Sequence, residues 1–264
     1  MVIQQAPAAP SAPTVPAQAA PNARLRLLKP EEIASYHEQG YVVVPGVFPA
    51  AELEEMDQEI DRLLDQPGND AGGVHPTWIF KIHQKSEMAA RFAEDERLQA
   101  LVADVVHPGL AIHSTKLVPK PPHSNDVCHW HQDEAFYFRP DDPDTVSRTR
   151  MSVWVPLQDA HEKNGGLWVV PGSHRWGIDP YHMVDTGQCR KVIDREAYAN
   201  EHAVPLRVSA GSVVLFSAWT WHHSKNNETD RVRRAFIVSY QEATVPKGAG
   251  DQWKVLRPAP PMLG

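Results

Sequence analysis

The sequence predicts a mainly β protein, an antiparallel barrel or jelly roll, with helices ahead of the strands. From about residue 110 the chain consists of short segments rich in β-branched and aromatic residues, separated by clusters of Gly, Pro, Asn and Asp. The one candidate interruption is a helix over 192–200. Many short strands joined by long connections favour an antiparallel sheet over the parallel sheet of an α/β protein.

The helices are expected before the strands. Residues 29–40 place a proline near a helix start, acidic side chains in the first turn and Gly40 at the stop. The segment 41–48, YVVVPGVF, predicts a short strand and a turn. Over 50–65 the apolar residues share one helical face, and a further helix is expected over 95–106. The expected strands that follow are 110–118, 148–156, 165–171, 204–208, 211–217 and 231–240.

Composition limits the domain organisation and the partners. The 264 residues suit one large domain or two small ones, and 42% hydrophobic residues suffice for a core. We expect a disordered Ala/Pro-rich tail over 1–24 and a single domain over 25–264. The net charge of −7, without a cluster of Lys or Arg, makes nucleic acid and anionic membranes poor partners. Monomer and homodimer both remain open.

The cysteines and the hydropathy predict a cytoplasmic protein. Cys128 and Cys189 form no C-x-x-C pair, and we expect each to be a small buried thiol in a reducing compartment. No apolar run approaches the roughly 18 residues that a membrane span requires.

The segment 129–138, HWHQDEAFYF, concentrates titratable groups ahead of an aromatic run. If it forms a strand, His131 and Asp133 point to the same face, because they are two residues apart. An imidazole and a carboxylate suit Fe(II), Mn(II) or Zn(II), and a third ligand must come from elsewhere. A polar surface loop is the alternative for this short motif taken alone.

A candidate third ligand, His222, follows the expected strand 211–217 in a turn that also holds Trp219. Arg233 comes eleven residues later, at the start of the last strand, where it and Arg234 must face opposite sides. An arginine that faces into a barrel needs an anionic partner, such as a bound dicarboxylate. An open iron site with an inward arginine behind it is the arrangement expected of a 2-oxoglutarate oxygenase.

Three ordered motifs, over 129–138, 151–177 and 221–235, resemble the phytanoyl-CoA dioxygenase family of Fe(II)/2-oxoglutarate oxygenases. The segment 28–48 also resembles the opening helix and strand of that family, so the resemblance runs from about residue 28 to 240. It implies a double-stranded β-helix (jelly-roll, cupin-like) core with flanking N-terminal α-helices.

The resemblance assigns the metal to His131, Asp133 and His222. The distal motif, in which a histidine is followed by Ser224 and Asn227, selects His222 rather than its neighbour. That neighbour, His223, stands where the family usually has a small residue, and an outward or supporting role is expected for it.

The resemblance also implies residues that bind 2-oxoglutarate. Arg233 and Ser224 match the positions that hold its far carboxylate, and Trp154 matches a residue that lines its pocket. Lys81 resembles an upstream lysine that reaches the co-substrate, and Lys116 is a further candidate. Candidates for the substrate pocket, with ordinary packing as the alternative, are Phe136, Tyr137, Phe138 and Trp219.

The implied activity is hydroxylation of an unactivated C–H bond in a small organic substrate, with Fe(II), O2 and 2-oxoglutarate, and release of succinate and CO2. Desaturation, epimerisation or ring formation with the same cofactors is the alternative within enzymes. A non-catalytic metal-binding jelly-roll protein is the alternative outside them. Halogenating relatives lack the aspartate, so the intact Asp133 argues against halogenation. The aromatic residues near the motifs suit an apolar or ring-bearing substrate.

Overall fold

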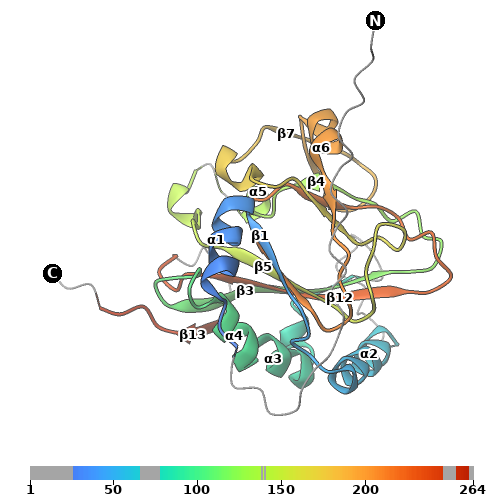
Figure 1. Cartoon of the computed structure of the whole chain (residues 1–264), viewed down its shortest axis with the longest axis horizontal. Coiled ribbons are helices and arrows are strands. Elements are labelled where there is room, and N and C mark those ends of the chain that lie inside the picture. Colours follow the sequence, from blue (N-terminus) through green and yellow to red (C-terminus); the bar gives the residue numbers. More distant parts are fainter. Residues whose placement is uncertain (1–25, 66–77, 138, 140, 246–253, 262–264) are drawn as a thin grey trace, which may run out of the picture.

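The computed structural model of the chain describes residues 26–65, 78–137, 139, 141–245 and 254–261 (Figure 1). The tail predicted over 1–24 lies outside these residues. The fold is mainly antiparallel sheet, with helices packed against one of its faces. In the described part of the chain, no helix combines the length and the apolar character needed to cross a membrane.

The strands of the described residues form two sheets and a hairpin, and the pairings within them are all antiparallel. In spatial order, the seven-stranded sheet contains β1 (Tyr41–Val44), β10 (Val213–Ser217), β5 (Met151–Pro156), β12 (Arg233–Gln241), β3 (Leu110–Lys120) and β13 (Lys254–Arg257), with β2 (Ile79–Phe80) also paired to β3. The four-stranded sheet contains β4 (Cys128–His131), β11 (His222–Ser224), β6 (Leu167–Val169) and β9 (Val204–Pro205). The hairpin is β7 (Tyr181–Met183) with β8 (Lys191–Ile193). Neither sheet closes on itself among the described residues.

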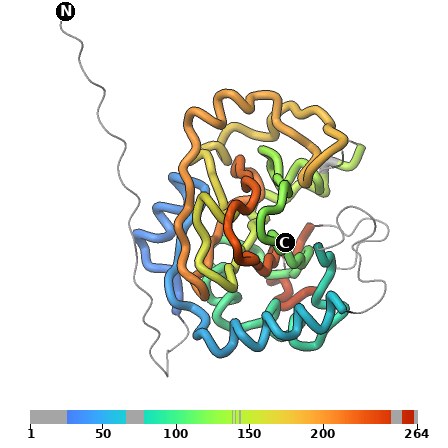
Figure 2. Tube along the Cα trace, turned by 90° about the vertical axis from the view of Figure 1, so that its right-hand side faces the viewer, coloured from blue at the N-terminus to red at the C-terminus, as the bar shows by residue number. Residues whose placement is uncertain are grey.

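The helices are short and mostly precede the sheets. They are α1 (Pro30–Gln39), α2 (Ala50–Leu64), α3 (Glu87–Ala93), α4 (Glu96–Val102), α5 (Glu134–Tyr137) and α6 (Glu196–His202), together with the 3₁₀ turns η1 (Ile82–Gln84), η2 (Pro143–Thr145) and η3 (Ser173–Trp176). Both views place α2 and the β7–β8 hairpin at opposite ends of the molecule (Figures 1 and 2).

Alternation along the strands of the larger sheet creates two cores. In β5, Val153 and Val155 face the helices, where they belong to the same apolar cluster as Ile60 of α2. Trp154 lies between them and faces the other way, in a cluster with Val169 of the smaller sheet. The larger sheet is therefore buried on both faces, and the predicted metal ligands lie on the side of the smaller sheet.

Most predicted elements are confirmed, with shifted ends. Helices were expected over 29–40, 50–65 and 95–106, and α1, α2 and α4 occupy these places. The helix expected over 192–200 begins later, as α6 after the strand β8, whereas α3 was not predicted. The segment 129–138 is a strand only in part, because β4 ends at His131 and the chain turns into α5 at Glu134.

Gly40 ends α1 in a left-handed conformation, with φ of 83°. A Cβ atom at this position would lie 2.6 Å from Oγ1 of Thr220, so the turn requires glycine. Thr220 Oγ1 donates to the carbonyl oxygen of Gly40 at 2.9 Å. The turn between α1 and β1 thereby holds the chain two residues before His222.

Candidate metal and co-substrate site

His131, Asp133 and His222 come together at the smaller sheet, and all three are buried. His131 ends β4, His222 begins β11, and the two are direct cross-strand partners. Asp133 follows β4 in the turn before α5. Nε2 of His131 lies 3.7 Å from Oδ1 of Asp133, and Nε2 of His222 lies 4.0 Å from its Oδ2. The three donor atoms lie within 4.8 Å of one another, close enough to share one metal ion.

Backbone carbonyls fix which nitrogen each imidazole offers. Nδ1 of His131 lies 2.7 Å from the carbonyl oxygen of His129, and Nδ1 of His222 lies 2.8 Å from that of Thr220. A carbonyl only accepts, so each Nδ1 carries the hydrogen and each Nε2 keeps its lone pair for a metal. Burial, followed by the neighbouring imidazole of His131, lowers the pKa of His222 to about 3, which leaves its ring neutral.

Asp133 is held as a carboxylate in this buried place. Ser152 Oγ donates to its Oδ2 at 2.5 Å, and Nζ of Lys116 lies 3.6 Å from its Oδ1. Burial alone would raise the pKa of Asp133, but Lys116 and the two neighbouring imidazoles hold it well below its ordinary value. A neutral imidazole and an ionised carboxylate are the forms that bind a metal. The donor set therefore fits Fe(II).

Arg233, at the start of β12, is buried and faces the smaller sheet. Its Nη2 donates to the carbonyl oxygen of Gly165 at 2.7 Å and its Nη1 to that of Val118 at 3.3 Å. Its Nε is buried without a hydrogen-bond partner among the described residues. Burial lowers the pKa of Arg233 to about 10. A buried guanidinium with an unused donor fits the carboxylate of a co-substrate.

The next arginine on the same strand faces the helices. Nη1 of Arg234 lies 3.0 Å from Oδ1 of Asp57, and its Nη2 lies 2.5 Å from Oδ1 of Asp61, both on α2. The two neighbouring arginines therefore face opposite sides of the sheet, as the sequence predicted.

Lys120 is a buried residue that the sequence analysis missed. It is the cross-strand partner of Arg233, and its Nζ donates to the carbonyl oxygens of Asp126, Ser224 (3.3 Å) and Lys225 (2.6 Å). Burial and then Arg233 lower the pKa of Lys120 to about 7. Two cations therefore adjoin one another where the far carboxylate of 2-oxoglutarate is expected. Only the alternation of side chains along β3 could have indicated this lysine, because Lys120 lies four residues after Lys116 and so shares its face of the strand.

The other predicted co-substrate residues divide into two groups. Trp154 and Ser224 are buried, and the ring centre of Trp154 lies 5.6 Å from the guanidinium carbon of Arg233. Lys116 reaches Asp133, as described above. Lys81 is exposed at the start of η1, and the structure does not bring it to this group.

A cavity of about 390 Å³ lies beside the metal ligands. Its lining includes His131 and Asp133, so a molecule bound in it would adjoin the metal position. Phe136 and Tyr137 also line it, whereas Trp219 instead donates Nε1 to the carbonyl oxygen of Ser147 at 2.9 Å. Phe138 lies outside the described residues. The rest of the described lining is Trp78, Phe80, Ser114, Lys116, Met183, Gln188, Cys189, Arg190 and Lys191.

Glu134, directly after Asp133, forms a buried ion pair that the sequence analysis did not foresee. Arg150 Nη1 lies 2.6 Å from both of its carboxylate oxygens. Arg150 also donates to Oε1 of Gln241 through Nε, at 3.0 Å. These contacts join the first turn of α5 to β12 and fix the backbone that carries Asp133.

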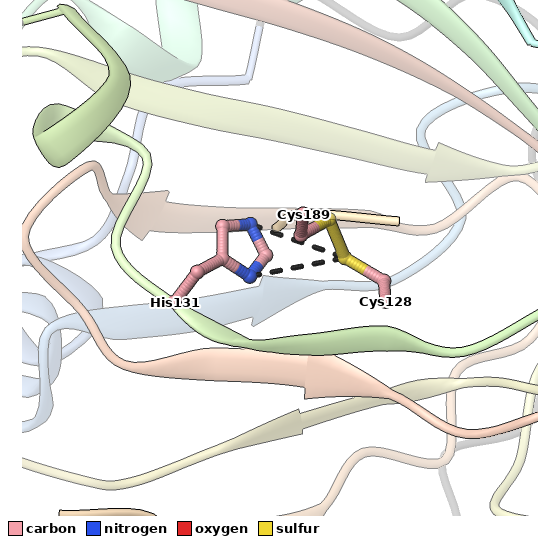
Figure 3. Close-up of side chains that lie close together, drawn as sticks. All are labelled: Cys128, His131 and Cys189. Atoms are coloured by element: carbon pink, nitrogen blue, oxygen red, sulfur yellow. Dashed lines mark hydrogen bonds between the residues drawn. A yellow bond between two sulfur atoms is a disulfide. The ribbon is translucent and has the colours of Figure 1, made fainter. Parts of the chain in front are cut away.

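Cys128 and Cys189 form a disulfide, which corrects the expectation of two separate thiols (Figure 3). Sγ of Cys128 lies 3.8 Å from Nδ1 and 4.0 Å from Nε2 of His131. The sequence could not show this pairing, because 61 positions separate the cysteines and only the fold brings them together. The disulfide links the strand of His131 to the cavity wall around Cys189.

Known proteins share this fold over most of their length. Ectoine dioxygenase from Stutzerimonas stutzeri (strain A1501) is 26% identical over 234 residues, which are 80% of this chain and 76% of that protein. The structure of EctD from S. alaskensis with 2-oxoglutarate and 5-hydroxyectoine has 26% identity and a TM-score of 0.69, covering 84% of this chain and 78% of that one. The alpha-ketoglutarate-dependent carbocyclase SnoK, at 24% identity and a TM-score of 0.66, covers 82% of this chain and 85% of its own, and it supports the fold alone.

These likenesses define the class of the protein, an Fe(II)/2-oxoglutarate-dependent dioxygenase. Its cofactors are accordingly Fe(II), 2-oxoglutarate and O2. The chain belongs to the phytanoyl-CoA dioxygenase (PhyH) family, whose match runs over residues 36–235.

Proposed function

We propose that this dioxygenase hydroxylates an unactivated C–H bond of a small organic substrate and releases succinate and CO2, on a double-stranded β-helix core. The observation that carries the proposal is the convergence of His131, Asp133 and His222, whose donor atoms lie within 4.8 Å of one another. The likeness to ectoine dioxygenases supports a small molecule as the substrate.

In this proposal His131, Asp133 and His222 hold Fe(II). Bound there, Fe(II) supplies activation of O2, decarboxylation of 2-oxoglutarate and attack on the C–H bond. The protein chain holds the three metal ligands in a fixed orientation. The carbonyl contacts at each Nδ1 fix both rings, and Ser152 fixes the carboxylate of Asp133.

Arg233 is the proposed anchor for the far carboxylate of 2-oxoglutarate, since its Nε has no partner among the described residues. Trp154 and Ser224 adjoin the guanidinium and the metal strand, where they would line the same pocket. Lys116, beside Asp133, is proposed to stabilise the anionic groups at the metal end. Lys81 is exposed and is given no part in this proposal.

Hydroxylation is not the only outcome that this machinery permits. The structural neighbours include the carbocyclase SnoK and the epimerase SnoN. The outcome depends on how the substrate lies against the metal, which the fold does not determine. Product mass separates the outcomes: hydroxylation adds one oxygen atom, ring closure or desaturation removes two hydrogens, and epimerisation leaves the mass unchanged.

Visible absorption under anaerobic conditions tests the proposed function. Fe(II) and then 2-oxoglutarate are added to the purified protein and to an Asp133→Ala variant. We expect a metal-to-ligand charge-transfer band in the wild type, lost or altered in the variant. If Fe(II) binds but no band develops with 2-oxoglutarate, the protein is a metal-binding protein without this co-substrate chemistry.

A further inference from the structure

We propose that the substrate combines an apolar or aromatic body with an anionic group, and that Arg190 and Lys191 bind that anion. The inference rests on the proposed function and narrows its substrate class. It is carried by the composition of the cavity wall, by the contacts that fix Lys191, and by the absence of acidic partners for both cations in the described chain.

The cavity wall is largely apolar. Trp78 and Phe80 contribute aromatic surface from around β2, and Phe136 and Tyr137 contribute it from α5. Met183, at the end of β7, is 62% exposed and adds a flexible apolar side chain to the same lining. Such a surface excludes water and favours a substrate body of similar character.

The charges of the lining are unbalanced. Of the described lining residues, Lys116, Arg190 and Lys191 are cationic, and Asp133 alone is acidic. Asp133 adjoins Lys116 at 3.6 Å and is a proposed metal ligand, so its charge is already matched. Fe(II) would add further positive charge. An anion in this cavity would therefore be favoured by Arg190 and Lys191, which no lining acid neutralises.

Lys191 is held in place by contacts other than ion pairs. Its Nζ donates to the carbonyl oxygen of Ala135 at 2.7 Å. The same atom lies 5.4 Å from the ring centre of Phe136 and 4.9 Å from that of Tyr181. No described acidic side chain forms an ion pair with it. A cation fixed by a carbonyl and two rings still has donors available for a bound anion.

Arg190 lies one residue before Lys191, and its side chain is exposed at the cavity. That side chain forms no hydrogen bond or ion pair with any residue that the structure describes. Its guanidinium can therefore offer a bidentate contact to a carboxylate or phosphate. The wall that carries it is attached to β4 by the Cys128–Cys189 disulfide. The backbone N–H of Gln188 also donates to the carbonyl oxygen of Val127, directly before β4, at 2.8 Å.

The proposed anion site is separate from that of the co-substrate. Arg233, the proposed anchor of 2-oxoglutarate, is not part of the described lining of this cavity. The neighbours of Arg233 are Gly165, Val118 and Trp154. Arg190 directly precedes β8, and Lys191 is the first residue of that strand. The anion that they bind would therefore belong to the substrate.

The test is anaerobic equilibrium dialysis of the protein with Fe(II) and saturating 2-oxoglutarate against 3-phenylpropionate and its neutral amide, 3-phenylpropionamide. The two probes share one aromatic body and differ in charge. We expect the carboxylate to bind about tenfold more tightly than the amide, as one charge-assisted contact predicts. The preference should fall in Arg190→Gln and vanish in the double variant with Lys191→Gln. It should persist in Lys163→Gln, an exposed cation outside this lining.

Three results would overturn the proposal: equal binding of the two probes, no binding of either at millimolar concentration, or an undiminished preference in the double variant. The proposal would also be overturned if Arg190→Gln lowered the affinity for 2-oxoglutarate, measured by the charge-transfer band, as much as Arg233→Gln does. Arg190 would then bind the co-substrate and not the substrate. Failure of the proposed function has a different signature, because the wild type would then lack the charge-transfer band whatever the probes do.

Discussion

Ser152 Oγ donates a hydrogen bond of 2.5 Å to Oδ2 of Asp133, and it does so from β5 in the larger sheet. His131 and His222 come from the smaller sheet, so this one contact joins the proposed metal site across both sheets. Ser239 is the cross-strand partner of Ser152, with the two Oγ atoms 3.3 Å apart, and it forms no hydrogen bond to Asp133 among the described contacts.

Ser152→Ala should weaken metal binding by about 10- to 100-fold, because loss of a contact that orients a ligand typically has this effect. Competition of Fe(II) or Mn(II) with a chromophoric chelator measures it. Ser239→Ala is the matched control, since it alters the neighbouring hydroxyl and leaves the contact with Asp133 intact. Equal affinities of wild type and Ser152→Ala would show that Asp133 needs no such support.

Arg233→Gln should weaken 2-oxoglutarate binding by about tenfold or more, because a charge-assisted contact is lost. The same change removes a buried cation that forms no ion pair with any described acidic side chain, so the stability of the protein without ligands should not fall. Titration of the charge-transfer band and urea unfolding measure the two effects. Weaker folding together with unchanged 2-oxoglutarate affinity would assign Arg233 a purely structural role.

His223 should make the stability of the metal-free protein depend on pH. Burial lowers its pKa from 6.5 to about 3, and the ring stacks on Trp130 with centres 4.0 Å apart. Below pH 6.5 the unfolded chain takes up a proton there and the folded chain does not, so stability is present above this pH and is lost as the pH falls. The loss approaches about 1.4 kcal/mol per pH unit.

His223→Gln should remove this contribution. Urea unfolding at several pH values between about 4 and 6 measures how the free energy of unfolding depends on pH. This dependence should be shallower in the variant than in the wild type, and the difference in slope should correspond to one proton taken up on unfolding. Parallel dependences would show that His223 accepts its proton in the folded protein.

The disulfide should stabilise the folded chain. For a separation of 61 residues, restriction of the unfolded chain is worth about 4 kcal/mol, and measured values often fall to about 2 kcal/mol. The double variant Cys128→Ser, Cys189→Ser should unfold at lower urea concentration, and dithiothreitol should destabilise the wild type alone. Detection of two reactive thiols in the native protein before reduction would contradict the pairing.

The sequence predicted the helices and strands well where local signals were strong. In α2, the buried residues Leu53, Met56 and Ile60 recur at helical spacing, and this spacing is visible in the sequence. It predicted α3 poorly, because Glu87–Ala93 is short and its burial depends on the sheet beneath it. The turn at Asp133 was also missed, since alternation alone cannot show where a strand ends.

The candidate site was predictable in part, because His131, Asp133 and His222 stand in recognisable motifs. Their supporting residues were not, since Ser152, Lys120 and Cys189 reach the site only through sheet register and a cross-link between distant positions. No local pattern distinguishes these three from other residues of their type.

The two neighbouring arginines of β12, Arg233 and Arg234, also favour one register of this strand in the sheet. A strand displaced by one residue would turn Arg233 toward α2 and bring Arg234 inward, because side chains alternate between the two faces. Arg234 would then lose Asp57 and Asp61, and its charge would enter a place that already holds Lys120. Mispaired arrangements of β12 are thereby penalised, and the favoured register is also the one that turns Arg233 toward its proposed place beside 2-oxoglutarate.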